Sequence, residues 1–387
     1  MASRTLLYFG HVPMEGAGSA IIVLRHLRRF SDDGWDVRIV ADWGQDHSLC
    51  HAAGWPVTQL PHRRWWWLPF NHDQAVSRKL RAWLWAGETA RWLGDTKVDG
   101  VLTYLSAFSD TLSIAAVGFA ERYNLPLATL VHDDSRCFTP NAQEAELGYR
   151  RRQWILARST VAWFASQQLA ACYDLPSEKT GLLPPIPEGA AAAAEAHGVS
   201  APLESPLLIY AGNYWPPQLP TLAAIAGAAR TAGGRLLAVL KEDAGHVAFL
   251  QASHVEWRRP FPRNTEALDY YRENASALVV SYAASSADMP WTRTSFPSKL
   301  IEYCHLAIPI LIIAPEDTAV MHWARARHFP DAFVPGDTAG ISGYVARLRD
   351  PSFRRERANL ARSFARGEFD PVSIQHQLAS SFSRISQ

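Results

Sequence analysis

The segment from residue 277 to residue 314 restricts the fold more than any other part of the sequence, because it combines two buried strands with a short helix. Residues 277–281 (ALVVS) and 309–313 (PILII) are almost wholly apolar. Such runs are typical of strands that are buried on both faces of a parallel sheet. Between them, Pro297 has no N–H and a fixed φ, and it suits the first position of a helix. The pattern predicts a strand, a polar loop, a helix and a second strand of a doubly wound sheet.

The amino end of this helix is a candidate anion site. In doubly wound sheets, ligands bind beyond the carboxyl ends of the strands, and a helix that begins there presents free N–H groups and the positive end of its dipole. The predicted first turn consists of Pro297, which contributes no N–H, Ser298, Lys299 and Leu300. We expect its N–H groups and the side chains of Ser298 and Lys299 to bind an anion, with the Glu302 carboxylate one turn further along.

The same alternation of apolar runs and helical stretches fills the rest of the chain and predicts an α/β fold with two Rossmann-like, doubly wound parallel-sheet domains. The length of 387 residues suits two cores better than one. A proline-rich segment followed by an alanine- and glutamate-rich stretch separates two series of apolar runs and marks the domain change. We predict an N-terminal domain over 1–188, a linker over 189–204, a C-terminal domain over 205–366 and a final helical segment over 367–387.

Charge and cysteine content exclude several classes of function. The 38 basic and 37 acidic residues give a net charge of +1, which does not indicate a nucleic-acid-binding protein. The four cysteines have no CxxC or Cys/His spacing, so neither a zinc site nor a disulfide framework is indicated, and we predict no metal and no cofactor. The N-terminus enters a strand without a signal-peptide core, and no apolar run reaches the ~20 residues of a spanning helix. We expect a cytoplasmic protein.

The segment 296–303 (FPSKLIEY), followed by a small-residue turn and a Pro-Ile strand, resembles the donor-site segment of retaining GT-B-fold glycosyltransferases of family four. In that family the helix carries two glutamates seven residues apart; the second holds the ribose hydroxyls of the nucleotide, and the first approaches the donor sugar. Glu302 matches the second, whereas Ser295 stands in the place of the first and departs from the pattern. The order of elements matches over nearly the whole chain, but the residue-level match is concentrated in 295–309.

The resemblance implies two domains that face each other across a cleft, and a final helix that crosses back to the N-terminal domain. Members of the family commonly bring an arginine and a lysine to the diphosphate from two turns of the C-terminal domain. Here the first turn has Gly212 and Asn213 and no basic residue, Lys241 is an inexact match for the second, and Arg293 is a further candidate. The candidate donor-binding residues are Gly16, Gly18, Gly212, Asn213, Lys241, Arg293, Ser295, Pro297, Ser298, Lys299, Leu300 and Glu302.

The glycine-rich turn with Gly16 and Gly18 follows the first strand. In the resembled family this turn meets the donor phosphates or the acceptor; the alternative is a tight turn needed only for packing. Polar residues also follow the apolar run 127–131, at the edge where a doubly wound domain places its ligand. The resemblance implies that His132 faces the donor sugar or the acceptor, and the neighbouring Asp133 and Asp134 are candidates to orient the acceptor hydroxyl. His132 and Asp133 are the candidate catalytic residues. GT-B enzymes do not depend on paired aspartates that hold a metal.

Tryptophan is abundant, with 15 residues, and three of them are adjacent: Trp65, Trp66 and Trp67. Neighbouring side chains point in different directions in any regular structure, so these three cannot all face one core. Exposed tryptophans beside arginines are typical of a contact with membrane headgroups or of a sugar-stacking platform. The loop is therefore our candidate for an acceptor contact or for a peripheral contact at the inner face of the membrane. The alternative is that the rings cap the N-terminal core.

Taken together, the sequence predicts a metal-independent hexosyltransferase of glycan biosynthesis that transfers a sugar with retention. The expected partners are a UDP-, GDP- or dTDP-sugar donor and the hydroxyl of a saccharide, lipid-linked or small-molecule acceptor. A UDP-sugar epimerase of the same architecture is an alternative, because Asp133, Asp134 and Asp288 offer carboxylates for acid–base work. A non-catalytic nucleotide-sugar-binding relative is another, motivated by Ser295 and by the missing basic residue near Gly212.

Overall fold

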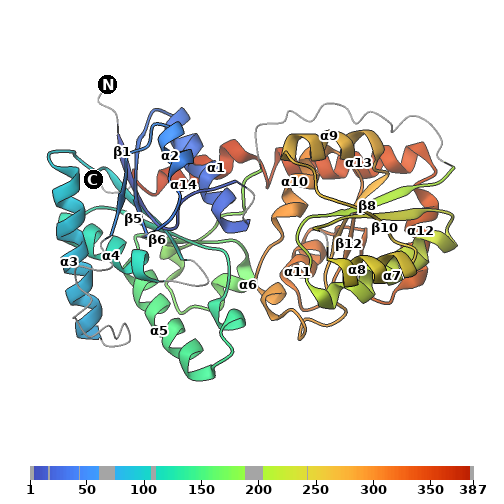
Figure 1. The fold of residues 1–387 in the computed structure, drawn as a ribbon, viewed down its shortest axis with the longest axis horizontal. Coiled ribbons are helices and arrows are strands. Elements are labelled where there is room, and N and C mark those ends of the chain that lie inside the picture. Colours follow the sequence, from blue (N-terminus) through green and yellow to red (C-terminus); the bar gives the residue numbers. More distant parts are fainter. Residues whose placement is uncertain are drawn as a thin grey trace. The chain divides into compact units, whose positions relative to one another are not determined.

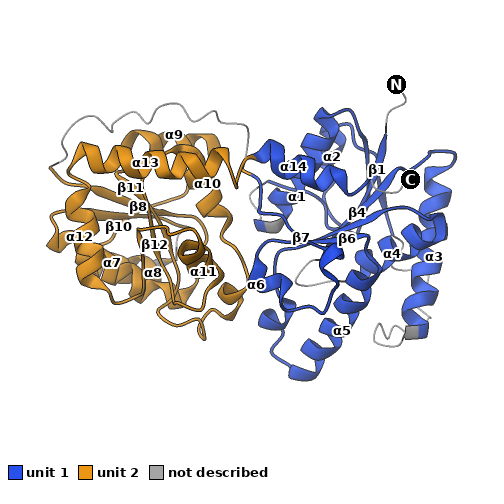
Figure 2. Ribbon diagram, turned by 180° about the vertical axis from the view of Figure 1, so that it is seen from behind, with its two compact units in different colours: residues 1–186, 371–387 blue, residues 187–370 orange. Residues whose placement is uncertain are grey.

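The computed structural model describes residues 4–15, 18–42, 44–60, 75–105, 110–187, 204–241 and 243–383. The chain forms two compact units (Figure 2). Unit 1 consists of Met1–Ile186 and Pro371–Gln387, and unit 2 consists of Pro187–Asp370. Of the predicted linker over 189–204, all but the last residue lies outside the described residues.

The described part of unit 1 contains a seven-stranded sheet in the order β3-β2-β1-β4-β5-β6-β7, and every pair of neighbouring strands is parallel. This order reverses between β1 and β4, as in a dinucleotide-binding Rossmann domain. The strands are β1 (Thr5–Phe9), β2 (Asp36–Ala41), β3 (Val57–Gln59), β4 (Gly100–Leu105), β5 (Leu127–Val131), β6 (Val161–Phe164) and β7 (Thr180–Leu182).

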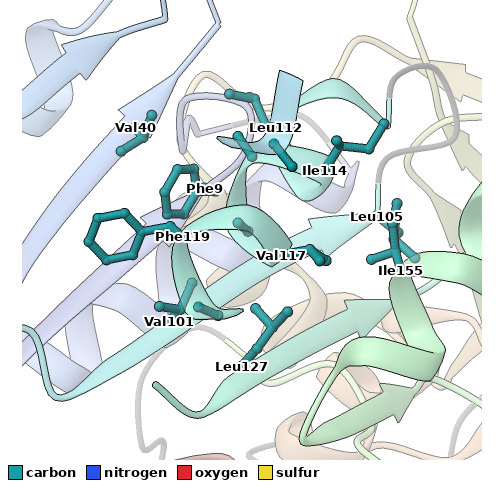
Figure 3. Close-up of a cluster of buried hydrophobic side chains, with 14 of the residues drawn as sticks. Phe9, Val40, Val101, Leu105, Leu112, Ile114, Val117, Phe119, Leu127 and Ile155 are labelled. Carbon is teal, nitrogen blue, oxygen red and sulfur yellow. The ribbon is translucent and has the colours of Figure 1, made fainter. Parts of the chain in front are cut away.

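Helices cover both faces of this sheet (Figure 1). They are α1 (Gly18–Asp32), α2 (Ser48–Ala52) and α14 (Pro371–Ser380) on one face, and α3 (Ala75–Leu93), α4 (Thr111–Tyr123) and α5 (Ala142–Arg158) on the other, with α6 (Gln167–Ala170) after β6. Successive residues of β1 alternate between the two cores, because Leu7 and Phe9 face α4 whereas Leu6 and Tyr8 face α1. Figure 3 shows the first of these cores, in which Phe9, Val101 and Leu127 pack against Val117 and Phe119 of α4.

Unit 2 repeats the plan with a six-stranded sheet among its described residues, in the order β10-β9-β8-β11-β12-β13. The strands are β8 (Leu207–Ala211), β9 (Arg235–Val239), β10 (Glu256–Arg258), β11 (Ala277–Ser281), β12 (Ile310–Ile313) and β13 (Ala332–Phe333). One face carries α7 (Leu219–Thr231), α8 (Ala244–Ala252) and α12 (Thr338–Arg347), and the other carries α9 (Asn264–Asn274), α10 (Ser298–Leu306), α11 (Ala319–Ala326) and α13 (Pro351–Arg366). All pairs are parallel, so the predicted α/β class with two Rossmann-like sheets is confirmed.

The last helix, α14, belongs to unit 1, although α13 before it belongs to unit 2. Ile374 and Leu378 of α14 are buried in the core that α1 forms on the sheet. Gln375 Oε1 lies 2.8 Å from Nδ1 of His26 on α1, and Trp163 Nε1 donates to Ser381 Oγ at 2.9 Å. Unit 1 is therefore built from both ends of the chain. In the described part of the chain, no helix is long and apolar enough to span a membrane.

Candidate functional site

The helix α10 begins one residue later than predicted. Pro297 is its N-cap, with an extended ψ of 112°, and Ser298 is the first helical residue. Leu300 N–H donates to the Pro297 carbonyl oxygen at 3.1 Å, and its side chain is fully buried. Among the described residues no side chain caps the helix, which leaves the N–H groups of Ser298 and Lys299 as its candidate anion donors.

The side chain of Lys299 lies against the turn that follows β8. Its Nζ donates to the Asn213 carbonyl oxygen at 3.2 Å and lies 4.8 Å from the centre of the Tyr210 ring. Gly212 has a φ of +108°, and a Cβ on it would lie 2.6 Å from Nζ. Burial lowers the pKa of Lys299 to about 8, and the Glu302 carboxylate opposes this shift. The structure thus brings together Lys299, Gly212 and Asn213, three residues that were predicted separately.

A buried hydrogen-bond network holds this turn in place. Gln218 is 3% exposed, and its Nε2 donates to the Ser281 carbonyl oxygen at the end of β11 at 2.5 Å and to the Tyr210 hydroxyl at 3.3 Å. Its Oε1 accepts from Trp215 N–H at 2.7 Å. The sequence analysis did not select Gln218 as a site residue. The available signal for its role was its amide side chain, which directly follows two prolines at the start of a helix and can hydrogen-bond to the nearby backbone.

Glu302 lies near a cluster of aromatic and basic side chains. Burial raises the pKa of Tyr271 on α9, the nearby Glu302 carboxylate raises it further, and Arg258 opposes the rise. The Arg258 guanidinium carbon lies 3.8 Å from the centre of the Phe261 ring and 4.6 Å from that of Tyr270. This flank of the sheet edge, formed by β10 and α9, therefore offers aromatic faces and a carboxylate.

Arg293 lies on the opposite flank and already has partners. Its Nε is 2.9 Å from Ser286 Oγ and 3.0 Å from Asp317 Oδ2, and Ser286 also donates to Asp317 at 2.6 Å. Hydrogen bonds from Ser286 and Arg293 lower the pKa of Asp317. Since the ion pair occupies part of the guanidinium, Arg293 is a weaker candidate for a phosphate than Lys299.

For the other predicted donor residues, the described contacts give less support for a role in donor binding. Ser295 is half-buried, and its N–H donates to the Trp291 carbonyl oxygen at 2.8 Å. Lys241 is exposed, two residues after β9. Gly18 is the first residue of α1, and a Cβ on it would meet nothing within 4 Å. Gly16 and the three adjacent tryptophans, Trp65, Trp66 and Trp67, lie outside the described residues.

In unit 1, His132 directly follows β5 and is part of a cluster of histidines at the carboxyl edge of the sheet. The Tyr104 ring of β4 stands between two of them, with centres 5.2 Å from His132 and 5.1 Å from His11, both edge-on. Burial lowers the pKa of His132 to about 3, and nearby His26 and His11 contribute to the shift. Burial likewise lowers the pKa of His26 to about 4. These imidazoles are neutral at pH 7.

Three ring nitrogens in this cluster have no hydrogen-bond partner among the described residues: Nδ1 of His132, Nε2 of His11 and Nε2 of His26. Buried polar atoms are normally satisfied, so such a group is typical of a place that receives water or ligand hydroxyls. Sequence reasoning selected His132 but missed His11 and His26. His11 lies two residues after the end of β1, and this position beyond a strand end was the available signal.

The two aspartates after His132 differ. Asp134 is committed to Arg136, because its carboxylate accepts from Arg136 Nη2 at 2.8 Å and from the Arg136 backbone N–H at 3.0 Å. Asp133 is half-buried, and its carbonyl oxygen lies 3.4 Å from Arg152 Nη1. In the described part of the chain, no three His, Cys, Asp or Glu residues are grouped so as to hold a metal ion.

No family model and no curated protein matches the sequence. Solved structures do. HepE from Anabaena, in complex with UDP and glucose, is 13% identical, with a TM-score of 0.65 over 99% of this chain and 100% of that chain. A glycosyltransferase from Rickettsia africae ESF-5 is 11% identical, with a TM-score of 0.67 over 99% and 98%. WaaG, a glycosyltransferase involved in lipopolysaccharide biosynthesis, is 14% identical, with a TM-score of 0.59 over 98% and 100%. These neighbours are GT-B glycosyltransferases, and the predicted GT-B fold is confirmed.

Proposed function

We propose that the protein is a glycosyltransferase that moves a hexose from a nucleotide-sugar to an acceptor hydroxyl. The observation that carries the proposal is the position of the Lys299 ammonium, at the amino end of α10 and against Gly212. The departing diphosphate of such a donor is negatively charged. A cation and the amino end of a helix dipole stabilise this charge, and a glycine permits close approach. The fold shared with glycosyltransferases agrees with this assignment.

We assign the donor to unit 2. The N–H groups of Ser298 and Lys299 and the Lys299 ammonium bind the diphosphate, and Glu302 accepts hydrogen bonds from the ribose hydroxyls. The nucleobase then lies on the flank of Tyr271 and Arg258, where aromatic faces are available. UDP is the first nucleotide to test, because HepE was crystallised with UDP and with UDP-glucose. The dipole and the lysine stabilise the leaving group without a metal, so activity should persist in EDTA.

We assign the acceptor to unit 1. The unpartnered Nδ1 of His132 is the candidate contact for the acceptor hydroxyl, with His11 on the other side of Tyr104 and Asp133 as its neighbour. A neutral imidazole can accept the proton of a hydroxyl or donate to its oxygen. We further propose, from the resemblance of 295–309, that transfer proceeds with retention of the anomeric configuration, which NMR of the product would establish.

Calorimetric titration with UDP tests the donor assignment. Replacement of Lys299 by Met or of Glu302 by Gln should raise the Kd for UDP about tenfold or more, because each change removes a charged hydrogen bond worth about 1.5–3 kcal/mol. The matched control is Lys97→Met, since Lys97 is 89% exposed in unit 1. If UDP, GDP and dTDP all fail to bind the unaltered protein, or if Lys299→Met binds normally, the assignment is wrong.

A further inference from the structure

Two tryptophans on different loops of unit 2 meet at the carboxyl edge of its sheet. Trp215 follows β8, Trp291 lies in the loop after β11, and these two strands are neighbours in the sheet. The ring centres are 4.6 Å apart at an interplanar angle of 54°. Trp215 nevertheless remains 46% exposed, so the contact leaves much of its indole surface open to solvent. A large aromatic surface left open at a ligand-binding edge needs an explanation.

Hydrogen bonds hold the backbone of both loops. The backbone N–H of Trp215 donates to buried Gln218, which is itself bonded to the end of β11. The Trp291 carbonyl oxygen accepts from the N–H groups of Thr294 and Ser295, at 3.1 Å and 2.8 Å. An aromatic side chain that is fixed and open loses little conformational entropy when a ring stacks on it.

The position of the pair relative to the proposed donor indicates which part of a ligand it meets. Glu302 lies near enough to Tyr271, on the flank of β10 and α9, to raise its pKa. Trp291 lies on the other flank, two residues before Arg293, which is bonded to Asp317 after β12. Lys299 lies between the two flanks, with its ammonium on the Asn213 carbonyl oxygen. Trp215 is two residues beyond Asn213, which places their Cα atoms within about 7 Å.

We propose that Trp215, backed by Trp291, is the stacking surface for the hexopyranose ring of the donor. The inference rests on the proposed function: if the nucleoside occupies the Glu302 flank and the diphosphate lies at Lys299, the group beyond the diphosphate is directed toward the tryptophans. A pyranose presents one face of C–H groups, and an indole presents an electron-rich face to them.

Paired titrations with UDP and UDP-glucose, in the absence of acceptor, test this proposal. Trp215→Ala should weaken UDP-glucose binding about three- to tenfold, in the range of one aromatic contact, and change the Kd for UDP less than about twofold. Trp215→Phe keeps an aromatic face and should recover most of the loss. Trp83→Ala, which removes a 59% exposed tryptophan from α3 in unit 1, is the matched control and should change neither Kd.

Each other outcome has a definite meaning. Equal weakening of UDP and UDP-glucose by Trp215→Ala would place the tryptophan against the nucleotide instead and overturn the proposal. An unchanged Kd for both ligands would also overturn it, while leaving the proposed function standing. If the unaltered protein binds neither ligand and also binds no GDP- or dTDP-sugar, the proposed function fails, and the stacking surface fails with it. Thermal melting of Trp215→Phe and Trp215→Ala separates a lost contact from a lost fold.

Discussion

At the scale of single residues, the close contact between Lys299 and Gly212 restricts position 212 of unit 2 to glycine. Gly212 combines a left-handed φ of +108° with a Cβ position only 2.6 Å from the Lys299 ammonium. Any other residue here is strained and also displaces the lysine. Glycine at 212 is therefore a condition for the ammonium to lie at the end of α10.

Gly212→Ala should therefore weaken UDP binding about tenfold, by the same mechanism as loss of the lysine. The control is Gly227→Ala in α7, where the new Cβ would meet nothing within 4 Å. Calorimetric titration of both variants checks the prediction. Normal UDP binding by Gly212→Ala would show that the lysine does not depend on the turn.

The pH dependence of donor binding follows from the same lysine. Burial lowers the pKa of Lys299 from 10.5 to about 8, so the ammonium loses its charge as the pH rises through about 8. Affinity for UDP should decrease above that pH, although a bound diphosphate raises the pKa again and moves the decrease to higher pH in the complex. Titrations between about pH 6.5 and 9.5 measure the effect. In Lys299→Met this decrease should disappear; a decrease that persists there must come from another group.

The buried histidines of unit 1 predict a second pH effect, in which the stability of the fold decreases at low pH. In the folded state the pKa of His26 is about 4, below its ordinary value of 6.5, so the unfolded chain takes up the proton first. The stability that neutral His26 contributes to the fold is present above pH 6.5 and is lost as the pH falls toward 4. For this residue the loss in the free energy of unfolding is about 3 kcal/mol. Urea unfolding at pH 7 and 4.5 should show a smaller difference for His26→Gln than for the unaltered protein. His322→Gln, at an exposed position in unit 2, should show the same difference as the unaltered protein.

At the scale of elements, the turn between β8 and η3 (Pro216–Gln218) depends on one buried amide. Gln218→Ala leaves Trp215 N–H and the Ser281 carbonyl oxygen without their partner, which should lower the stability of unit 2 by about 1–3 kcal/mol. It should also weaken UDP binding, because the turn carries the Asn213 carbonyl oxygen that holds Lys299. Gln251→Ala, at an exposed position on α8, is the control for chemical denaturation. Equal stability of the two variants would mean that the turn is held by other contacts.

The elements differed in how far the sequence could predict them. Strands buried on both faces, such as β5 and β11, were predicted because an unbroken apolar run of that length, rich in β-branched residues, is typical of a parallel sheet. The short helices α2 and α6 were not predicted, since each spans five residues or fewer and carries no clear periodicity. The helix α8 was also missed, although it has nine residues, because its apolar side chains show no single face.

The same limit applied to the candidate site. The α10 segment was found from contiguous residues, whereas the cluster of His11, His26 and His132 is brought together only by the strand order of unit 1 and by α1. The spacing of these three histidines along the chain does not indicate that they are close together. The interaction of Lys299 with Asn213 spans 86 residues and is invisible to sequence periodicity for the same reason.

At the scale of the whole molecule, unit 1 depends on a helix from the far end of the chain. Leu378 of α14 is fully buried among side chains of α1 and the sheet. Leu378→Ala should lower the stability of unit 1 by about 2–5 kcal/mol through the cavity it leaves. Val372→Ala on the same helix, at a 60% exposed position, should have little effect. Urea unfolding of both variants makes the comparison, and similar stabilities would show that α14 is dispensable.

The return of α14 also has a consequence for how the protein is made. A ribosome releases the first strands of unit 1 early, but the helix that completes their core emerges only after all of Pro187–Asp370. Unit 2 is continuous in the chain and can fold as soon as it has been synthesised, whereas unit 1 cannot complete its core before α14 has been synthesised. Unit 2 is thus the first that can finish folding, and until α14 has been synthesised the nascent chain exposes the α14-binding surface of unit 1 to chaperones.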